Sequence, residues 1–337
     1  MTANNPGSEA PLGRPAFPSQ SSVLDEHALL HRIVSEYSVD NVRTCRFLSR
    51  GDSDIYRVVA ERANFYLKVY RPPMTKSQAE AEARLVEYLA KHSVPVVSVV
   101  RRSDGEYASE VLASEGSRAI LLFEEAPPAL PPQLEIAHMH ALGEVLACLH
   151  DAADIGPRLG GLPTIDLDSI VADWVPSILR FADEDAAAFL DHVIGHIRPQ
   201  LSEIPREIPN WGVCHADLVL SNVRYGSNGV TLFDFGDCGI TYRGLEMAIL
   251  FWSLEHRDLD QRDVLWEAFL NGYGQIRNLP DRLEERLSAF LILRELSFLG
   301  GNAATLPLRL GTEPFDSDFM SSGFDRIRSY LGRSGTS

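Results

Sequence analysis

The sequence predicts an α+β protein with two lobes, a small β-rich N-terminal lobe and a larger, mostly helical C-terminal lobe. The chain has 337 residues, enough for about two domains or one bilobal unit. Short strand-like runs dominate its first third, whereas longer helical patterns fill most of the rest. A stretch with four prolines in nine residues, 124–132, separates the two parts and is typical of a stiff extended connection.

The elements of the N-terminal lobe follow in order from local patterns. Residues 1–22 are rich in Pro, Ser, Gly and Asn and predict a disordered leader. Apolar residues at helical spacing predict a helix at 23–36, and two strand-like runs flanking the polar turn Ser49–Asp54 predict a hairpin. Periodicity further predicts a charged amphipathic helix at 76–92 and strands at 64–70, 94–101, 105–112 and 119–123. We assign the N-terminal lobe to 23–123 and the hinge to 124–132.

The C-terminal lobe, assigned to 133–337, is predicted to be helical around one exception. Six helical patterns are expected, at 134–150, 165–182, 186–201, 244–254, 263–273 and 282–300. The exception is the segment 211–242, which alternates like short hairpins. The sequence therefore predicts a small set of strands embedded in the helical lobe.

Composition excludes several classes of protein. With 45% hydrophobic and 23% charged residues, the chain matches an ordinary globular protein. No apolar run reaches the ~18 residues of a membrane-spanning helix, and the N-terminus lacks the basic and apolar regions of a secretory signal. The four cysteines form no C-x-x-C pair, which indicates reduced thiols in a cytoplasmic protein.

The net charge of −16 argues against binding to nucleic acid along its phosphates. It would suit a cationic small molecule, although acidic composition also serves solubility alone. The sequence gives no prediction of oligomeric state.

The strand-like segment carries two motifs with chemical meaning. His215-x-Asp217 is followed at fixed spacing by Asn222, and Asp234-Phe235-Gly236 comes soon after. Both match the catalytic-loop and metal-loop signatures of kinases. A carboxylate such as Asp217 can orient an acceptor hydroxyl and take its proton, while Asn222 and Asp234 offer the hard oxygen ligands that Mg²⁺ prefers.

Residues upstream complete the expected nucleotide site. Lys68 lies on the third predicted strand, where the kinase lysine contacts the α- and β-phosphates. Its expected partner is Glu82 on the following helix. Glu80 and Glu87 compete for this role, but Glu82 shares a helical face with Leu89.

The turn between the first two strands is a second candidate contact with the nucleotide. Backbone N–H groups around Ser49, Gly51 and Ser53 would cover the phosphates. With a single glycine, this turn taken alone is also consistent with an ordinary hairpin. Asp237 is a further candidate, either for an acceptor amine or for the surroundings of the metal.

These motifs resemble the aminoglycoside phosphotransferase and choline kinase-like superfamily, small-molecule kinases that share the protein-kinase fold. The resemblance runs from roughly Val42 to Gly300 and is carried also by 48–58, 82–89, 94–96, 121–125 and 244–248. It implies a bilobal protein-kinase-like fold. It also implies that Asp217 is the catalytic aspartate and that Asn222 and Asp234 are the metal ligands.

The same resemblance gives roles to two further segments. Residues 121–125 resemble the family's hinge, whose backbone receives adenine, so Phe123, Glu124 and Ala126 are expected to contact the base. Glu246 falls where the family has an acid that braces the catalytic loop. The family often has Gly in the position of Ala216, so this chain departs there.

The sequence thus predicts a phosphotransferase that uses ATP or GTP with Mg²⁺ and phosphorylates a small-molecule hydroxyl. An antibiotic, an amino alcohol or an amino acid would fit, and the stretch 233–238 is most similar to branches acting on the last two classes. Two alternatives stay open: a bacterial stress-type protein Ser/Thr kinase, and a nucleotide-binding regulator without catalysis. His192 and His196 are four residues apart on a predicted helix and could form a metal pair, but no third ligand lies nearby in the sequence, which favours surface or packing histidines.

Overall fold

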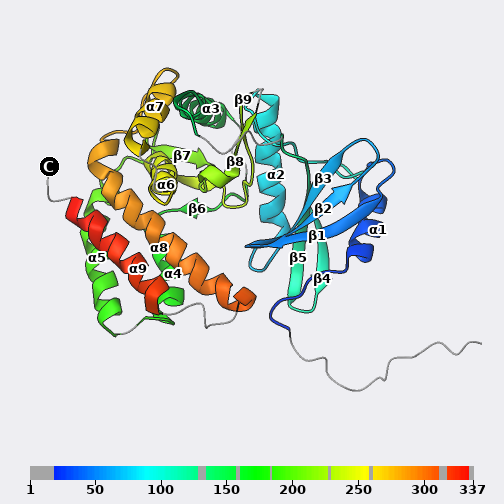
Figure 1. Ribbon diagram of the computed structural model, residues 1–337, viewed down its shortest axis with the longest axis horizontal. Coiled ribbons are helices and arrows are strands. Elements are labelled where there is room, and N and C mark those ends of the chain that lie inside the picture. Colours follow the sequence, from blue (N-terminus) through cyan, green and yellow to red (C-terminus); the bar gives the residue numbers. More distant parts are fainter. Residues whose placement is uncertain are drawn as a thin grey trace, which may run out of the picture.

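The computed structural model describes residues 19–127, 134–156, 160–182, 184–226, 229–257, 261–310 and 317–333. An antiparallel sheet with two helices forms the N-terminal part, and a mostly helical part follows (Figure 1). The predicted α+β architecture, with the larger lobe at the C-terminal end, is confirmed. Residues 1–18 of the expected leader and 128–132 of the expected hinge lie outside the described residues.

The N-terminal sheet has five strands in the order β1-β2-β3-β5-β4, and every neighbouring pair is antiparallel. Its elements are α1 (Glu26–Glu36), β1 (Thr44–Arg50), β2 (Ser53–Val59), β3 (Asn64–Tyr70), α2 (Lys76–Lys91), β4 (Ser109–Ala113) and β5 (Gly116–Glu124). Asp25 begins α1 by accepting a hydrogen bond from the N–H of Ala28, and Thr75 with Gln78 forms a capping box at α2.

Alternation along β3 decides which side chains reach each face of the sheet. Leu67 and Val69 pack with α1 on one face. Tyr70 packs with α2 on the other, where Lys68 also points because successive side chains alternate. The register of β3 therefore aims Lys68 at the face covered by α2 and turned toward the helical part (Figure 1).

The predicted strand at 94–101 is wrong. This segment makes only isolated bridges within the described part of the chain, from Val96 to Leu232 and from Val99 to Phe123. It crosses from the C-terminal strands to the N-terminal sheet. Its valines fit a strand by propensity, but no single neighbour runs beside it for more than one residue pair.

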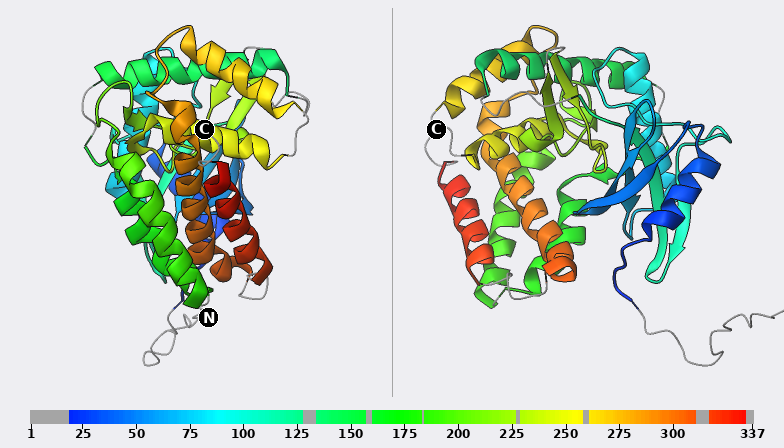
Figure 2. Two further views of the ribbon diagram at one scale, coloured as in Figure 1. Left: turned by 90° about the vertical axis from the view of Figure 1, so that its left-hand side faces the viewer. Right: turned by 45° about the vertical axis from the view of Figure 1, so that its right-hand side comes forward.

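The C-terminal part contains short strands within a helical framework (Figures 1 and 2). Its elements are α3 (Ile136–Ile155), β6 (Thr164–Ile165), α4 (Leu167–Leu179), α5 (Glu184–Ser202), β7 (Trp211–Cys214), the 3₁₀ turn η1 (Leu220–Asn222), β8 (Val223–Gly226), β9 (Gly229–Leu232), β10 (Gly239–Tyr242), α6 (Arg243–Glu255), α7 (Arg262–Gly274), α8 (Leu283–Leu310) and α9 (Ser317–Arg333). The strands form one sheet in the order β6-β10-β7 and the hairpin β8-β9.

Helix α6 lies at the centre of this part, with residues 243–254 all buried. Helices α3 and α7 pack closely because two glycines allow it. A Cβ on Gly143 would lie 2.1 Å from the carbonyl oxygen of Phe269, and one on Gly272 would lie 2.0 Å from that of His140. The same two helices also meet where Nδ1 of His150 on α3 lies 2.8 Å from the hydroxyl of Tyr273 on α7.

Helix α9 is absent from the sequence-based prediction. Its buried residues, Met320, Phe324, Ile327 and Tyr330, recur at helical spacing, so the periodicity was available to find it. Helix α8 also extends ten residues beyond the predicted end at Gly300. Among the described helices, none combines the length and apolar character needed to cross a bilayer.

Candidate active site

The candidate catalytic loop, residues 215–222, lies in the connection between β7 and β8. The backbone N–H of Asp217 donates to Nδ1 of His215 (3.3 Å), and Nε2 of the same ring contacts the carbonyl oxygen of Phe233 (2.9 Å). These partners assign the proton to Nε2. The His215 ring also packs on Phe235, with centroids 4.3 Å apart, so it ties the catalytic loop to the metal loop.

Glu246 at the start of α6 holds the first residues of this loop. Its Oε1 accepts the backbone N–H groups of His215 (2.6 Å) and Ala216 (3.2 Å). Ala216 has φ 64°, in the left-handed region that favours glycine, which explains why the departure from the family's glycine is a strained position. The Glu246 carboxylate thus stabilises a turn whose left-handed backbone is unfavourable for the alanine at position 216.

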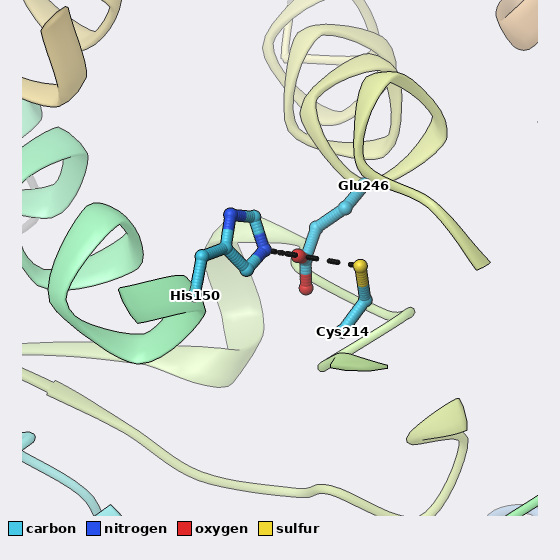
Figure 3. Close-up of side chains that lie close together, drawn as sticks. All are labelled: His150, Cys214 and Glu246. Carbon is cyan, nitrogen blue, oxygen red and sulfur yellow. Dashed lines mark hydrogen bonds and ion pairs between the residues drawn. The ribbon is translucent and has the colours of Figure 1, made fainter. Parts of the chain in front are cut away.

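Glu246 belongs to a fully buried cluster with His150 and Cys214 (Figure 3). Nε2 of His150 lies 2.5 Å from Oε2 of Glu246 and 3.8 Å from Sγ of Cys214, and its Nδ1 lies 2.8 Å from the hydroxyl of Tyr273. Burial lowers the pKa of His150 to about 4 and raises that of Cys214. Because these side chains form hydrogen bonds with one another, the cluster holds the Glu246 carboxylate in place beside the loop.

Three further hydrogen bonds fix the part of the loop that follows. Nδ2 of Asn222 donates to Oδ2 of Asp217 (2.8 Å) and to its carbonyl oxygen (2.9 Å). The N–H of Leu220 donates to Oγ of Ser253 on α6 (3.0 Å). Because the amide nitrogen of Asn222 is used in this way, its Oδ1 is the atom left to act as a ligand.

The candidate metal loop, residues 234–236, meets Lys68 from the N-terminal sheet. Nζ of Lys68 lies 2.6 Å from Oδ1 of Asp234, whose φ is 66°. The positive charge of Lys68 lowers the pKa of Asp234. Burial opposes the ammonium charge of Lys68, but the nearby carboxylates outweigh it and raise the pKa of Lys68. A Cβ on Gly236 would lie 2.6 Å from Nζ, so glycine is needed for this approach.

Of the three carboxylates on α2 considered from the sequence, Glu82 lies beside Lys68, with Oε1 3.6 Å from Nζ. Its Oε2 accepts the hydroxyl of Tyr70 (2.5 Å), and burial raises the pKa of Glu82. Glu80 instead accepts the N–H groups of residues 107 and 108, and Glu87 pairs with Arg101. Tyr70 was not predicted, although alternation on β3 places it on the same face as Lys68.

The candidate nucleotide turn is shorter than predicted, because Ser49 still belongs to β1 and Ser53 is already the first residue of β2. The N–H of Gly51 donates to the carbonyl oxygen of Ser53 (2.9 Å). Below it, buried Asp54 pairs with arginines 50, 71 and 118. Burial opposes the charge of Asp54, but hydrogen bonds from these arginines outweigh it and lower its pKa.

The candidate hinge residues lie at the end of β5 and just beyond it. Phe123 pairs with Tyr66 on β3, and the N–H of Glu124 donates to the carbonyl oxygen of Ser98 (2.9 Å). Ala126 is half-buried and follows the strand. Phe123 and Glu124 therefore belong to the sheet.

Arg294 on α8 is a residue of the site that sequence reasoning missed. Its Nη2 lies 3.0 Å from Oδ1 of Asp217. The pKa of Asp237 is raised to about 7 by partial removal from solvent and by the nearby negative charges of Asp217 and Asp234. No local motif surrounds Arg294, so its contact with Asp217 becomes visible only in the fold.

The histidine pair that the sequence analysis set aside lies on the surface. His192 and His196 are both exposed on α5. The chain also carries two acidic runs, 183–185 and 255–260, and of these residues 183 and 258–260 lie outside the described residues. Within the described part, Glu255 pairs with Arg262 and Arg333.

A protein-family model described as a phosphotransferase enzyme family matches residues 44–285. An uncharacterized protein of Synechocystis sp. is 31% identical over 293 residues, covering 85% of this chain and 80% of its own. A homoserine kinase of Granulibacter bethesdensis is 28% identical over 270 residues, covering 77% and 80%.

Solved structures share the fold. A microcompartment-associated aminopropanol kinase has a TM-score of 0.73 at 23% identity and covers 93% of this chain and 99% of its own. An amicoumacin kinase with bound AMP-PNP and Ca²⁺ has a TM-score of 0.76 at 19% identity and covers 93% and 94%. Because the family model spans most of the chain and includes both motifs, the chain belongs to the phosphotransferase enzyme family and is a phosphotransferase with a protein-kinase-like fold.

Proposed function

We propose that the chain transfers the γ-phosphate of ATP or GTP to a hydroxyl group of a small molecule. The observation that carries this proposal is the meeting of two sets of residues from different lobes. Lys68 of the N-terminal sheet lies 2.6 Å from Asp234 of the metal loop, and Asp217 is held by Asn222 in the adjacent catalytic loop. Phosphoryl transfer depends mainly on such positioning and on charge stabilisation.

On the nucleotide side, Lys68 would bind the α- and β-phosphates. Glu82 orients it, because this carboxylate is buried 3.6 Å from Nζ and is itself held by the hydroxyl of Tyr70. Backbone groups at Ser49, Gly51 and Ser53 would cover the phosphates, and those of residues 123–126 would receive the base. Lys68 would exchange part of its present contact with Asp234 for phosphate oxygens.

On the metal side, Asn222 and Asp234 fit a divalent cation by the chemistry of their donors. Oδ1 of Asn222 and the carboxylate of Asp234 are hard oxygen ligands, and the second oxygen of Asp234 is not used by Lys68. Mg²⁺ bound there would neutralise negative charge on the phosphates. The left-handed backbone at Asp234 and the small Gly236 keep this carboxylate close to Lys68.

On the acceptor side, Asp217 would act as the base. It orients the acceptor hydroxyl and takes its proton as the hydroxyl oxygen forms a bond to the γ-phosphorus. The bond from that phosphorus to the β–γ bridging oxygen breaks, and the nucleoside diphosphate leaves. Glu246 and Asn222 hold Asp217 in place without touching the reacting atoms.

The substrates named for related proteins support a small-molecule acceptor. One relative is a homoserine kinase, and the structural neighbours include kinases of aminopropanol and amicoumacin. We therefore place amino acids, amino alcohols and antibiotics first among the candidate acceptors.

The test is the release of ADP or GDP with Mg²⁺ against a panel of hydroxyl-bearing amino acids, amino alcohols, aminoglycosides and sugars. We expect turnover with at least one small acceptor and phosphate on its hydroxyl. Phosphate transferred only to protein would instead establish a protein kinase. Tight nucleotide binding without transfer to any acceptor would indicate a regulator, and either result would refute the proposal.

A further inference from the structure

Asp217 has two carboxylate oxygens, and different elements hold them. Asn222, on the metal side, donates to Oδ2 at 2.8 Å and to the backbone oxygen at 2.9 Å. Arg294, on α8, lies 3.0 Å from Oδ1. Oδ1 is thus the oxygen turned away from the metal ligands, where an acceptor hydroxyl has to approach.

Arg294 is held in place but keeps unused binding capacity. Its guanidinium lies over the ring of Trp252, 4.9 Å from the centroid, and its side chain is 14% exposed. Its Nε is buried without a hydrogen-bond partner in the described part of the chain. The neighbouring Glu295 does not pair with it, because Glu295 accepts from Trp252 (2.7 Å) and pairs with Arg326 (2.7 Å).

The pair between Arg294 and Asp217 creates a condition on the acceptor. A base needs a free oxygen for the hydroxyl, so the guanidinium has to share or leave Oδ1 when the acceptor binds. A cationic group placed there would be repelled by Arg294. A carboxylate would attract it, satisfy its unused donors in a two-pronged contact and free Oδ1.

We propose that Arg294 binds a carboxylate of the acceptor, so that the substrate is a hydroxy acid, such as a β- or γ-hydroxy amino acid. This inference rests on the proposed function, since it identifies the substrate class of the same site. The net charge of −16 favours a cationic acceptor from a distance, but such attraction is largely screened beyond about 8–10 Å in physiological salt. Next to Asp217, the charge of Arg294, whose Nη2 lies 3.0 Å from Oδ1, therefore decides whether an anionic or a cationic group is preferred.

The test compares acceptors that differ only by the carboxylate. L-Homoserine is paired with 3-amino-1-propanol, L-threonine with 1-amino-2-propanol, and L-serine with ethanolamine. Binding is measured by calorimetry on the protein loaded with Mg²⁺ and a non-hydrolysable ATP analogue, and kcat/KM is measured with Mg-ATP. The binding measurement does not need transfer, so it separates this inference from the proposed function.

In the wild type, we expect the carboxylate to improve binding and kcat/KM roughly 10–100-fold within at least one pair, the range of a charge-assisted hydrogen bond. In Arg294→Gln this ratio should disappear. Binding and kcat/KM of the hydroxy acid should weaken, while those of the paired amino alcohol should stay within a few-fold of the wild-type values. Arg294→Lys, which keeps the charge without the fork, should give an intermediate ratio. Arg328→Gln on α9, where the side chain is exposed, is the control.

Three outcomes would overturn the inference. The first is a wild-type protein that binds no acid better than its partner. The second is phosphoryl transfer that requires Asp217 and goes to an acceptor without an anionic group. The third is an equal loss for both members of a pair in Arg294→Gln, which would mark Arg294 as a positioning residue or a cation for the transferred phosphate. Carboxylate-dependent binding without any transfer would instead refute the proposed function alone.

Discussion

Replacing Glu246 by Gln tests how firmly the catalytic loop is held. Glu246 is fully buried and makes three short contacts: Oε1 with the N–H groups of His215 and Ala216, and Oε2 with Nε2 of His150. Its pKa is lowered, because the contacts with His150 and His215 outweigh the opposing effect of burial, so the carboxylate is ionised. Glutamine keeps the shape and removes the charge.

The magnitude follows from these contacts. A hydrogen bond to a charged group contributes about 1.5–3 kcal/mol and a neutral one about 0.5–1.5, so each bond weakens by ~1 kcal/mol. The amide oxygen can still accept both backbone N–H groups. The amide NH₂ then faces His150, which can move its proton to Nδ1 because the hydroxyl of Tyr273 is able to accept it. Three weakened bonds amount to a loss of ~3 kcal/mol in the free energy of unfolding.

Glutamine is more informative than alanine at this position. Alanine would leave three buried donors unpaired at ~1–3 kcal/mol each, which approaches the whole stability of a typical domain.

The assay measures chemical denaturation and steady-state kinetics on the same variant. For Glu246→Gln, we expect unfolding to become easier by about 2–4 kcal/mol and kcat to fall roughly 10–100-fold, since a displaced base loses its alignment. Nucleotide affinity should hold, because Lys68 does not contact Glu246. Glu267→Gln, at an exposed carboxylate on α7, is the control. Stability within ~0.5 kcal/mol of wild type together with unchanged kcat would refute this reasoning.

Further predictions concern pH, backbone strain and nucleotide binding. Burial holds the folded-state pKa of His150 at about 4, below its usual 6.5, so the unfolded chain binds more protons and up to ~3 kcal/mol of stability is lost as pH falls from 6.5 to 4. His150→Gln should flatten that pH dependence in denaturation curves while exposed His192→Gln leaves it, and an unchanged slope in His150→Gln would contradict the assignment. Ala216→Gly should stabilise the fold by about 0.5–1 kcal/mol by relieving φ 64°, and a loss of stability would argue against strain there. Lys68→Met should weaken Mg-ATP binding roughly 10–100-fold in calorimetry, and wild-type affinity would count against its phosphate role.

The grouping of the candidate catalytic residues was predictable because its signals are local. His215, Asp217 and Asn222 lie within eight residues, and Asp234 follows the next hairpin. The pairing of Lys68 with Glu82 was also accessible, since strand alternation and helical spacing aim both side chains at the same region. Local periodicity could have given Tyr70 and α9 as well.

Arg294 was not predictable in this way. It lies far along the chain from Asp217, on a helix whose pattern indicates only a packed apolar face. The packing of α8 against α6 brings its guanidinium over Trp252 and next to the catalytic loop. Likewise, the segment 94–101 has strand-like composition, but its partners Leu232 and Phe123 belong to different sheets. Tertiary packing decides both cases.

The most direct test of the account is Asp217→Asn, measured on the acceptor that the wild type phosphorylates. Asparagine keeps the size of the side chain and removes the base, while Asp191→Asn on α5, at an exposed carboxylate, serves as the control. The account predicts that phosphoryl transfer falls at least 10²-fold, the lower range of general-base catalysis, while calorimetry shows Mg-ATP binding close to that of the wild type. Transfer at the wild-type rate in Asp217→Asn would contradict the central claim.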